Sequence, residues 1–580
     1  MTVAQDRRAK GRRPFALLVL CLIILVPFHL HSQVSPSVSY ERLLNAAKEP
    51  QNWLTYSGTY LSQRHSLLTQ IDPTNVKNLE QKWIYQTQMF GPWQATPLVV
   101  DGIMYVTQRP NDVVALDAKT GRAFWIYRHN TSPDQKACCG ANNRGVAILG
   151  DTLFMGTLDA YLIALDARSG RPRWKVQVGD IKAAYSMTLA PLVIKDKVLV
   201  GVGGGEFGIR GFIAAYDVRT GKEIWRFYTI PGPGEPGHET WEPCPPSSSS
   251  SPTSPSYCDP EAWKHGGGPV WLTGSYDPEL NLTYWGTGNA GPDWNPDQRP
   301  GDNLYTASVV ALDADTGELK WHFQFTPHDR YDYDSVQIPV LIDLPSNGRT
   351  TKLMLWANRN GFFYVLDRAT GRFLSGNPFV KVNWASGLDD SGRPIQTPQP
   401  PGAPTWPGNQ GGTNWYSPSY SPRTGLFYVS AWEDYATIFG GVPVQYQEGR
   451  QFGGGANKPY GPVPGAPGVP TLRRGPINTW TETAGRGAVI ALDPRTGEQK
   501  WKFQMTDVSD SGLLTTASDL LFTGGREGYF QVLDARTGAL LWSTNLGGQI
   551  VNGPITYQVD GEQYVAAIAG HNLVAFGLRD

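Results

Sequence analysis

One motif recurs along the whole chain and limits its possible folds more than any other feature. Each copy has a short apolar run, then Asp, two residues, Thr or Ser, Gly, three residues and Trp. The Trp follows the Asp by eight residues in every complete copy. A repeat of this kind indicates an architecture built from one supersecondary unit. Complete copies begin at Asp117, Asp166, Asp217, Asp313, Asp493 and Asp534, and a further copy at Asp367 has Ser375 in place of Trp.

Each copy is predicted to form a strand, a tight turn and a second strand. The apolar run, such as 161–166, is typical of a buried strand, and the Gly allows the positive φ that a tight turn needs. The Trp then lies on an alternating, half-buried strand. Consecutive copies are typically 41 to 54 residues apart, which suits one four-stranded blade of a β-propeller per repeat.

Seven copies predict seven blades, and the two ends of the chain supply an eighth. Trp83 lies on an unpaired strand near the start, and 551–577 contains three strands with no motif after them. Pairing these segments closes the ring and removes the exposed sheet edges that favour aggregation. We therefore predict an all-β, eight-bladed propeller.

Residues 33–580 are predicted to form this single domain, with loop insertions near 228–262, 380–412 and 436–478. Residues 1–32 combine four arginines with an apolar run and are predicted to be a secretory signal, or alternatively a retained N-terminal anchor. Either interpretation places the body of the protein outside the cytoplasm, where disulfides can form. Cys244 and Cys258 bracket a Ser- and Pro-rich loop and either pair or remain free thiols.

Two function classes find no support in the sequence. The net charge is −1 and charged residues make up 17% of the chain, so there is no basic surface for nucleic acid. The motif C-x-x-C-H is absent from the sequence, so no c-type haem is attached. Any electrons that leave this protein are expected to go to a separate partner.

The densest group of acids is H-D-R-Y-D-Y-D, at 328–334. Asp332 and Asp334 are two residues apart, so in an extended strand both side chains face the same way. Two converging carboxylates repel unless a cation lies between them. Glu206 and Asn289 are further oxygen ligands of the kind that hard cations prefer. The alternative is an ion pair with Arg330, and sequence order alone does not bring the four oxygen ligands together.

Several separated motifs resemble the quinoprotein alcohol dehydrogenases, the methanol and ethanol dehydrogenase family that uses pyrroloquinoline quinone (PQQ). They follow the family's order over essentially the whole mature chain. The resemblance implies an eight-bladed propeller with tryptophan-docking repeats. The matching segments are C-C-x(3)-N-R-G at 138–145, G-x-E-x-G-x-R-G at 204–211, and the segments 271–282, 286–303, 326–333 and 358–361.

The resemblance implies a role for each cofactor-binding residue. Cys138 and Cys139 are expected to form a vicinal disulfide on one face of the quinone, the alternative being two reduced buried thiols. Trp271 is expected to stack on the opposite face, the alternative being ordinary core packing. Gln94 stands where relatives often have Glu, which puts that contact in doubt. The remaining residues that match cofactor-binding positions are Arg144, Thr188, Gly204, Gly205, Arg359, Asn414 and Trp415.

The resemblance also implies a metal ion. Glu206, Asn289 and Asp332 match the family's metal ligands, and Asp332 also matches its proposed catalytic base. Asp334 matches the lanthanide-dependent members, whereas calcium-dependent members have a small residue there. A trivalent hard cation favours an additional carboxylate, so a lanthanide is favoured, with calcium as the alternative.

The implied activity is periplasmic oxidation of a primary alcohol to the aldehyde. Asp332 takes the alcohol proton and hydride moves to the metal-activated quinone. Electrons then pass to a soluble cytochrome c-type acceptor, and a homodimer is left open. The alternatives are a quinoprotein dehydrogenase for polyols, sugars or polymeric alcohols, and a non-catalytic propeller scaffold.

Overall fold

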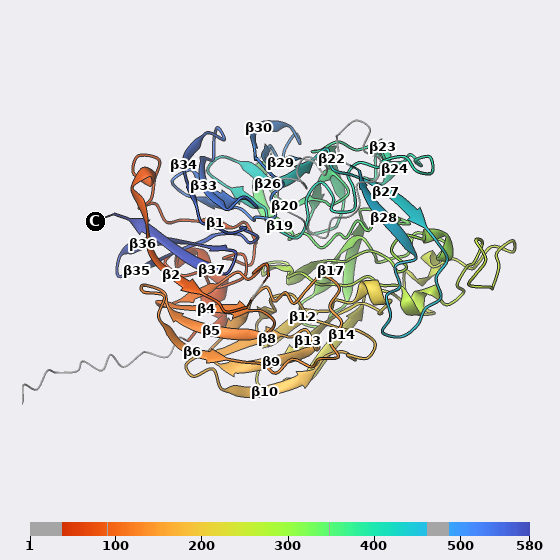
Figure 1. The fold of residues 1–580 in the computed structure, drawn as a ribbon, viewed down its shortest axis with the longest axis horizontal. Coiled ribbons are helices and arrows are strands. Elements are labelled where there is room, and N and C mark those ends of the chain that lie inside the picture. Colours follow the sequence, from red (N-terminus) through yellow and green to blue (C-terminus); the bar gives the residue numbers. More distant parts are fainter. Residues whose placement is uncertain (1–36, 90, 347–348, 461–485, 580) are drawn as a thin grey trace, which may run out of the picture. The chain divides into compact units, whose positions relative to one another are not determined.

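The computed structural model describes residues 37–89, 91–346, 349–460 and 486–579. The proposed signal at 1–32 lies outside the described residues, and so do residues 461–478 of the 436–478 insertion. The described residues form one compact unit. Its sheets are arranged as eight blades of a β-propeller (Figure 1), which confirms the predicted fold.

The first four blades each contain four antiparallel strands in sequence order. The strands are β3 (Leu98–Val100), β4 (Ile103–Gln108), β5 (Asp112–Asp117) and β6 (Ala123–Tyr127); β7 (Ala147–Leu149), β8 (Thr152–Gly156), β9 (Tyr161–Asp166) and β10 (Pro172–Gln177); β11 (Leu192–Ile194), β12 (Lys197–Gly201), β13 (Phe212–Asp217) and β14 (Glu223–Tyr228); and β15 (Ser275–Asp277), β16 (Leu282–Gly286), β17 (Ser308–Asp313) and β18 (Leu319–Gln324).

The next three blades follow the same plan, with one addition. Their strands are β19 (Val340–Ser346), β20 (Arg349–Ala357), β21 (Phe362–Asp367) and β22 (Phe373–Pro378); β25 (Ser419–Ser421), β26 (Leu426–Glu433), β29 (Arg486–Leu492) and β30 (Gln499–Gln504); and β31 (Leu514–Thr516), β32 (Leu520–Gly524), β33 (Tyr529–Asp534) and β34 (Leu540–Asn545). A short strand from the N-terminal region, β1 (His65–Ser66), adds to β31 in parallel as a fifth strand.

The eighth blade joins the two ends of the chain, as predicted. It consists of β35 (Ile555–Val559), β36 (Glu562–Ala569) and β37 (Asn572–Leu578), completed by β2 (Leu79–Gln86). In this blade β2 pairs antiparallel with β37, and Trp83 lies opposite Ala575. The propeller is therefore closed by backbone hydrogen bonds between segments almost 500 residues apart in sequence.

The repeated Gly and Trp join each blade to its neighbour. A Cβ on Gly121 would lie 2.6 Å from Cε3 of Trp83, so the indole lies flat against the turn of the next blade. The Trp83 Nε1 also donates to the Ala118 carbonyl at 3.1 Å. The same contact recurs for Trp125 on Gly170, Trp174 on Gly221, Trp225 on Gly317, Trp321 on Gly371 and Trp501 on Gly538.

The incomplete copy shows what this contact requires. Because Ser375 replaces the Trp of that blade, the turn glycine of the next repeat, Gly497, meets the side chain of Asn377 instead. Each motif Asp also accepts hydrogen bonds from backbone N–H groups of its own turn, as Asp117 does from Lys119 and Thr120. The motif therefore has a structural role, since Asp stabilises the turn and Gly leaves room for the indole.

Additional elements occur in the predicted insertions. Residues 228–262 contain the 3₁₀ helix η4 (His238–Thr240) and a disulfide between Cys244 and Cys258. The segment 380–412 contains the two-stranded sheet of β23 (Ala385–Leu388) and β24 (Pro394–Gln396). The described part of 436–478 contains the hairpin of β27 (Ala436–Gly441) and β28 (Gly455–Tyr460).

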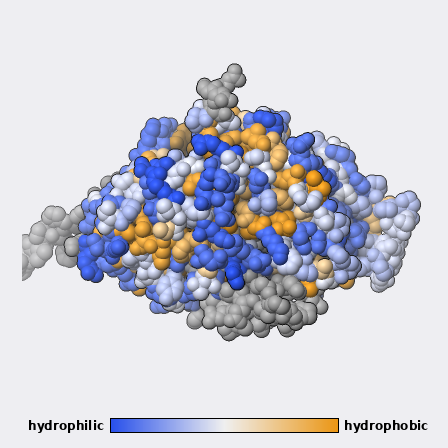
Figure 2. Space-filling view, turned by 90° about the horizontal axis from the view of Figure 1, so that it is seen from above, coloured by the Kyte–Doolittle hydropathy of each residue, from blue (hydrophilic) through white to orange (hydrophobic). Residues whose placement is uncertain are grey.

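The surface of the described residues mixes polar and apolar side chains. Several exposed large apolar residues lie on the outermost strands of blades, among them Ile84 on β2, Phe124 on β6 and Leu540 on β34. On the face in Figure 2, hydrophobic residues form separate groups among hydrophilic ones. Helices in the described residues are short, such as α1 (Tyr40–Leu44), and none could span a lipid bilayer.

The Gly121→Ala variant should lose more stability than Gly425→Ala. Both glycines have a φ near +70° in a tight turn, but a Cβ meets the Trp83 indole only at Gly121 and open space at Gly425. The positive φ should cost about 1 kcal/mol in each variant, and overlap with Trp83 about 1–3 kcal/mol more at Gly121. Thermal unfolding of the two variants measures the difference, and equal shifts would contradict the docking role of Trp83.

Candidate active site

The candidate site lies at the end of the propeller opposite the repeated turns. In each antiparallel blade, the motif turn joins the third strand to the fourth. The predicted site residues instead lie in loops at the other strand ends. Glu206 follows β12, Arg359 follows β20, and Asp332 and Asp334 lie between β18 and β19. The motif therefore builds the scaffold at one end and leaves the loops at the other end free to carry chemistry.

These loops enclose a cavity of about 310 Å³. Its volume is at the lower end of the range of roughly 300–1,000 Å³ for small-molecule sites. Among the predicted residues, Asn289 and Gly205 do not line it: Asn289 lies behind Asp334, and Gly205 packs against Pro269. The predicted residues that do line it are Gln94, Cys138, Cys139, Arg144, Thr188, Gly204, Glu206, Trp271, Asp332, Asp334, Arg359, Asn414 and Trp415.

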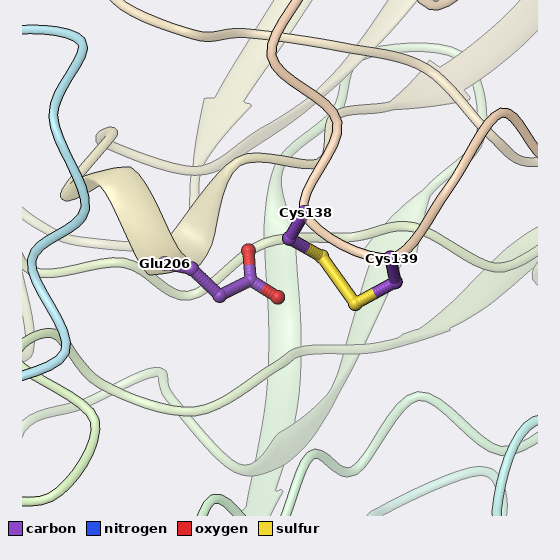
Figure 3. Close-up of side chains that lie close together, drawn as sticks. All are labelled: Cys138, Cys139 and Glu206. Carbon is purple, nitrogen blue, oxygen red and sulfur yellow. A yellow bond between two sulfur atoms is a disulfide. The ribbon is translucent and has the colours of Figure 1, made fainter. Parts of the chain in front are cut away.

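One wall of the cavity is a disulfide between the adjacent residues Cys138 and Cys139. The Glu206 carboxylate points toward this disulfide (Figure 3), and one of its oxygens lies within 4.8 Å of both sulfur atoms. Disulfide sulfurs carry no thiolate charge and are poor metal ligands. The short distance from Glu206 to the sulfur atoms therefore does not indicate a sulfur-bound metal. It shows that Glu206 and the disulfide line the same part of the cavity.

Arg359 holds the two aspartates of the acid cluster. Its Nη1 donates to Asp334 Oδ2 at 2.7 Å, its Nη2 to Asp332 Oδ2 at 3.0 Å and its Nε to the Asn409 carbonyl at 2.6 Å. The alternative interpretation of the cluster, an ion pair with Arg330, is wrong. Arg330 is largely exposed, and its ion pair is with Asp297, at 3.7 Å.

Local backbone geometry turns Asp332 toward the cavity. The Asp329 carboxylate accepts the backbone N–H groups of Tyr331 and Tyr333, both at 3.0 Å, which wraps the chain around it. Asp332 lies between them with a φ of 58°, a left-handed conformation that non-glycine residues seldom adopt. Backbone strain of this kind is concentrated at functional sites.

Burial and mutual repulsion dominate the electrostatics of the cavity. Burial, and then the nearby charge of Asp334, raise the pKa of Glu206 to about 7. Burial raises the pKa of Asp332 well above its usual range, although Arg359 acts to lower it. The pKa of Asp293 is raised by burial and by Glu206. Four carboxylates line the cavity and two of them pair with Arg359, an arrangement suited to a multivalent cation.

Arg144 is placed between two aromatic rings. Its guanidinium carbon lies 4.9 Å from the ring centroids of both Trp271 and Trp415, and its Nη1 donates to Thr188 Oγ1 at 2.9 Å. Burial lowers the pKa of Arg144 to about 10. Within the described residues, the buried atoms Arg144 Nε, Gln94 Oε1 and Asn142 Oδ1 have no hydrogen-bond partner. Such atoms are expected where a polar ligand completes the site.

Comparison with known proteins decides the family. The family described as "Glucose/ethanol/alcohol dehydrogenase, beta-propeller domain" matches residues 53–383. The quinoprotein alcohol dehydrogenase PedH of Pseudomonas putida KT2440 is 37% identical over 577 residues, which cover 96% of this chain and 92% of PedH. The chain belongs to the PQQ-dependent alcohol dehydrogenases.

Further relatives represent two kinds of alcohol dehydrogenase. The lanthanide-dependent methanol dehydrogenase of Methylacidiphilum fumariolicum SolV is 36% identical, covering 94% of this chain and 89% of that protein. The solved structure of the quinohemoprotein alcohol dehydrogenase ADHIIG from Pseudomonas putida HK5 has a TM-score of 0.83 at 35% identity, covering 94% of this chain and 83% of that one. A second family, described as outer membrane protein assembly factor BamB, matches only residues 485–579.

The cavity of the dehydrogenase fits PQQ, a flat quinone that carries carboxylates. Arg144 offers an unpartnered N–H beside two indole rings, which suits a carboxylate or quinone oxygen. A disulfide and aromatic rings give the cavity surfaces against which a flat ring can pack. The residues present in the cavity therefore match the chemistry of the cofactor.

Several lining residues were not found from the sequence. Asp293 and Trp294 lie within the segment 286–303, which resembles the family, and Asp293 occupies one of its variable positions. The sequence could have indicated Asp293, because it is an acid only four residues after the predicted ligand Asn289. Asn142 and Ser186 gave no comparable signal, and neither did Asn409 or Gln410, because short polar residues in loops are common.

The Arg359→Ala variant of the metal-free dehydrogenase should be much less stable than the wild type. Only 6% of the Arg359 side chain is exposed, and its removal leaves Asp332 and Asp334 as uncompensated buried charges. Breaking a buried pair in this way costs about 3–5 kcal/mol. Denaturant unfolding measures the loss. Arg330→Ala is the matched control and should change stability by less than about 1 kcal/mol, because its ion pair is exposed.

Proposed function

We propose that this dehydrogenase oxidises a primary alcohol to the aldehyde, using PQQ and one metal ion held in the cavity. The observation that supports this most is the single cavity that gathers the disulfide, Trp271, Arg144 and the acid cluster. When bound, PQQ supplies the acceptor for two electrons from the alcohol, and the metal supplies Lewis acidity.

The residues of the chain would bind and orient these groups. Cys138–Cys139 and Trp271 offer the two surfaces between which a flat cofactor would lie. The remaining cofactor contacts are charged or polar, and Arg suits carboxylates because its planar fork binds two oxygens at once. These contacts are proposed for Arg144, Thr188, Arg359, Gln94, Asn414, Trp415 and the backbone around Gly204 and Gly205.

Asp332 is proposed as the catalytic base. One of its oxygens, Oδ2, accepts a hydrogen bond from Arg359 at 3.0 Å. Its other oxygen, Oδ1, has no hydrogen-bond partner among the described residues, and Asp332 lines the cavity. Burial raises the pKa of Asp332, whereas the charges of Arg359 and of a bound cation would favour its ionised form, the form that can take the hydroxyl proton of an alcohol. The left-handed backbone at Asp332 holds the carboxylate in this position.

The metal ligands are proposed to be Glu206, Asp332 and Asp334, which line the cavity, and Asn289, which lies directly behind Asp334, with a lanthanide favoured over calcium. Three of these are carboxylates, and Arg359 provides the only cationic group paired with them in the described cavity. A trivalent ion compensates this charge better than a divalent one. The similarity to a protein named lanthanide-dependent methanol dehydrogenase supports the same assignment.

The surroundings of the reaction are also proposals. Residues 1–32 would direct the enzyme to the periplasm, where the Cys244–Cys258 disulfide is stable. Because the sequence has no C-x-x-C-H motif, an external cytochrome c-type protein would accept the electrons. A polyol, sugar or polymeric alcohol is the alternative substrate class.

A reconstitution experiment tests the proposed reaction. The full-length protein, stripped of metal and supplied with PQQ, is assayed with lanthanum or calcium over primary alcohols from methanol upward, with an artificial dye as electron acceptor. Lanthanum-dependent oxidation is expected, and Asp332→Asn should lower kcat by at least about 100-fold because the proton acceptor is lost. Near-normal turnover of Asp332→Asn, with PQQ and metal bound, would contradict the role of this base.

The Asp334→Ala variant should shift the metal preference toward calcium. Asp334 accepts from the Asn289 backbone at 2.8 Å and from Arg359 at 2.7 Å, so it contributes both charge and order to the site. Removing its charge should weaken lanthanum binding more than calcium binding, because the Coulomb energy scales with the charge of the cation. Competition between the two metals measures this, and an unchanged preference would show that Asp334 does not select the metal.

A further inference from the structure

We propose that Asp293 positions Asn289 and, through its charge, increases the selectivity of the metal site for a trivalent over a divalent cation. This inference rests on the proposed function, because it takes Asn289 as a metal ligand. It assigns a role to a carboxylate that belongs to neither the proposed metal ligands nor the proposed cofactor contacts.

Asn289 is held between two carboxylates. Its side-chain Nδ2 donates to Asp293 Oδ1 at 2.9 Å, and its backbone N–H donates to Asp334 Oδ1 at 2.8 Å. Both hydrogen bonds are buried, with Asn289 4% exposed and Asp293 5% exposed. One bond fixes its side-chain amide and the other fixes its backbone. Asn289 therefore has little freedom to rotate.

The bond to Asp293 determines where the Asn289 oxygen points. The side-chain amide is planar, so directing Nδ2 at Asp293 directs Oδ1 away from it. In the absence of Asp293 the amide could rotate and present N–H groups, which repel a cation. Groups that hold a metal ligand from behind in this way typically affect metal affinity about 10–100-fold.

The segment that carries Asp293 is braced by the third insertion. The backbone N–H of Trp294 donates to the Gly453 carbonyl at 2.9 Å, and the N–H of Phe452 donates to the Glu206 carbonyl at 2.7 Å. Two neighbouring residues of the insertion thus bind the segments of Asp293 and Glu206 together. The position of Asp293 relative to the site is therefore set by tertiary structure and not only by its place in the loop.

Asp293 also adds negative charge to the cavity. It lines the same cavity as Glu206, Asp332 and Asp334, and no ion pair of Asp293 occurs among the described residues. Its attraction for a bound cation is proportional to the cation's charge, in a ratio of three to two for a trivalent and a divalent ion. Removing the charge should therefore reduce affinity for the trivalent ion by the larger factor.

Two substitutions separate position from charge. In Asp293→Asn an amide oxygen can still accept from Asn289, so only the charge is lost, whereas Asp293→Ala loses both. If the charge contributes about 10-fold to calcium affinity, it should contribute about 30-fold to terbium affinity, following the charge ratio. Asp293→Asn should therefore lower the preference for terbium over calcium about threefold, and Asp293→Ala should weaken both metals by about 10–100-fold.

The full-length, metal-free protein, supplied with PQQ, is titrated with terbium, and terbium emission reports binding. Calcium is then added to displace the terbium, which gives the relative affinity for the two metals. Asp297→Asn is the matched control, because Asp297 is on the same loop but its side chain is 78% exposed and paired with Arg330. It should bind both metals as the wild type does. Thermal unfolding establishes that each variant is folded, and the isosteric Asp293→Asn keeps the test valid if Asp293→Ala does not fold.

Each outcome bears on the inference. Wild-type affinities for both metals in both Asp293 variants would overturn it while leaving the proposed function intact. Equal losses for terbium and calcium in Asp293→Asn would overturn the selectivity role. A wild-type protein that binds neither metal would remove the proposed metal site and this inference together.

Discussion

The contact between a tryptophan indole and the turn of the next blade is the interaction on which this structure depends. The indole needs a flat turn with no side chain, and a Cβ on Gly121 would lie only 2.6 Å from Trp83. The backbone of this turn also needs a residue that tolerates a positive φ. One glycine satisfies both requirements, which explains why Gly and Trp recur together. Six blades are thereby joined to the next by an indole packed on a turn glycine and, at several positions, by an indole hydrogen bond.

The docking contacts lie at one end of the propeller, which leaves the other end available for function. The docking turns occupy the end where the third and fourth strands meet, and the loops at the opposite end carry no part of the repeat. Those loops differ in length from blade to blade. They bring Cys138, Glu206, Trp271 and Asp332 from different blades into a single cavity. A rigid scaffold is well suited to holding such a constellation, because a small displacement of a catalytic group costs much of its effect.

Within the cavity, the charge balance is set by burial. Two aspartates share the Arg359 guanidinium, and burial raises the pKa of the nearby Glu206 to about 7. The site is thus electrostatically incomplete as a set of protein groups alone. In the proposed function a multivalent cation completes it, and the negative charge of the cavity, including that of Asp293, would influence which cation is preferred. The same carboxylates that repel one another in isolation become ligands and ligand supports around a metal.

The sequence by itself determined the scaffold. The repeat of Asp, Gly and Trp predicted the number of blades, and the unpaired strand at Trp83 predicted the closure of the ring, because both follow from local turn geometry and strand pairing. The resemblance to the quinoprotein dehydrogenases named most of the residues that line the cavity.

The tertiary structure decided how those residues combine. Sequence order did not show that Asp332 and Asp334 pair with Arg359 rather than with their neighbour Arg330, nor that Asp293 faces Asn289. The contacts of Arg359 join loops from different blades, so no spacing along the chain encodes them. Asp293 and Asn289 are four residues apart in one loop, but only the folded loop shows that their side chains meet. The repeat is local and can be read from the sequence, whereas the site is assembled across blades and depends on the closed ring.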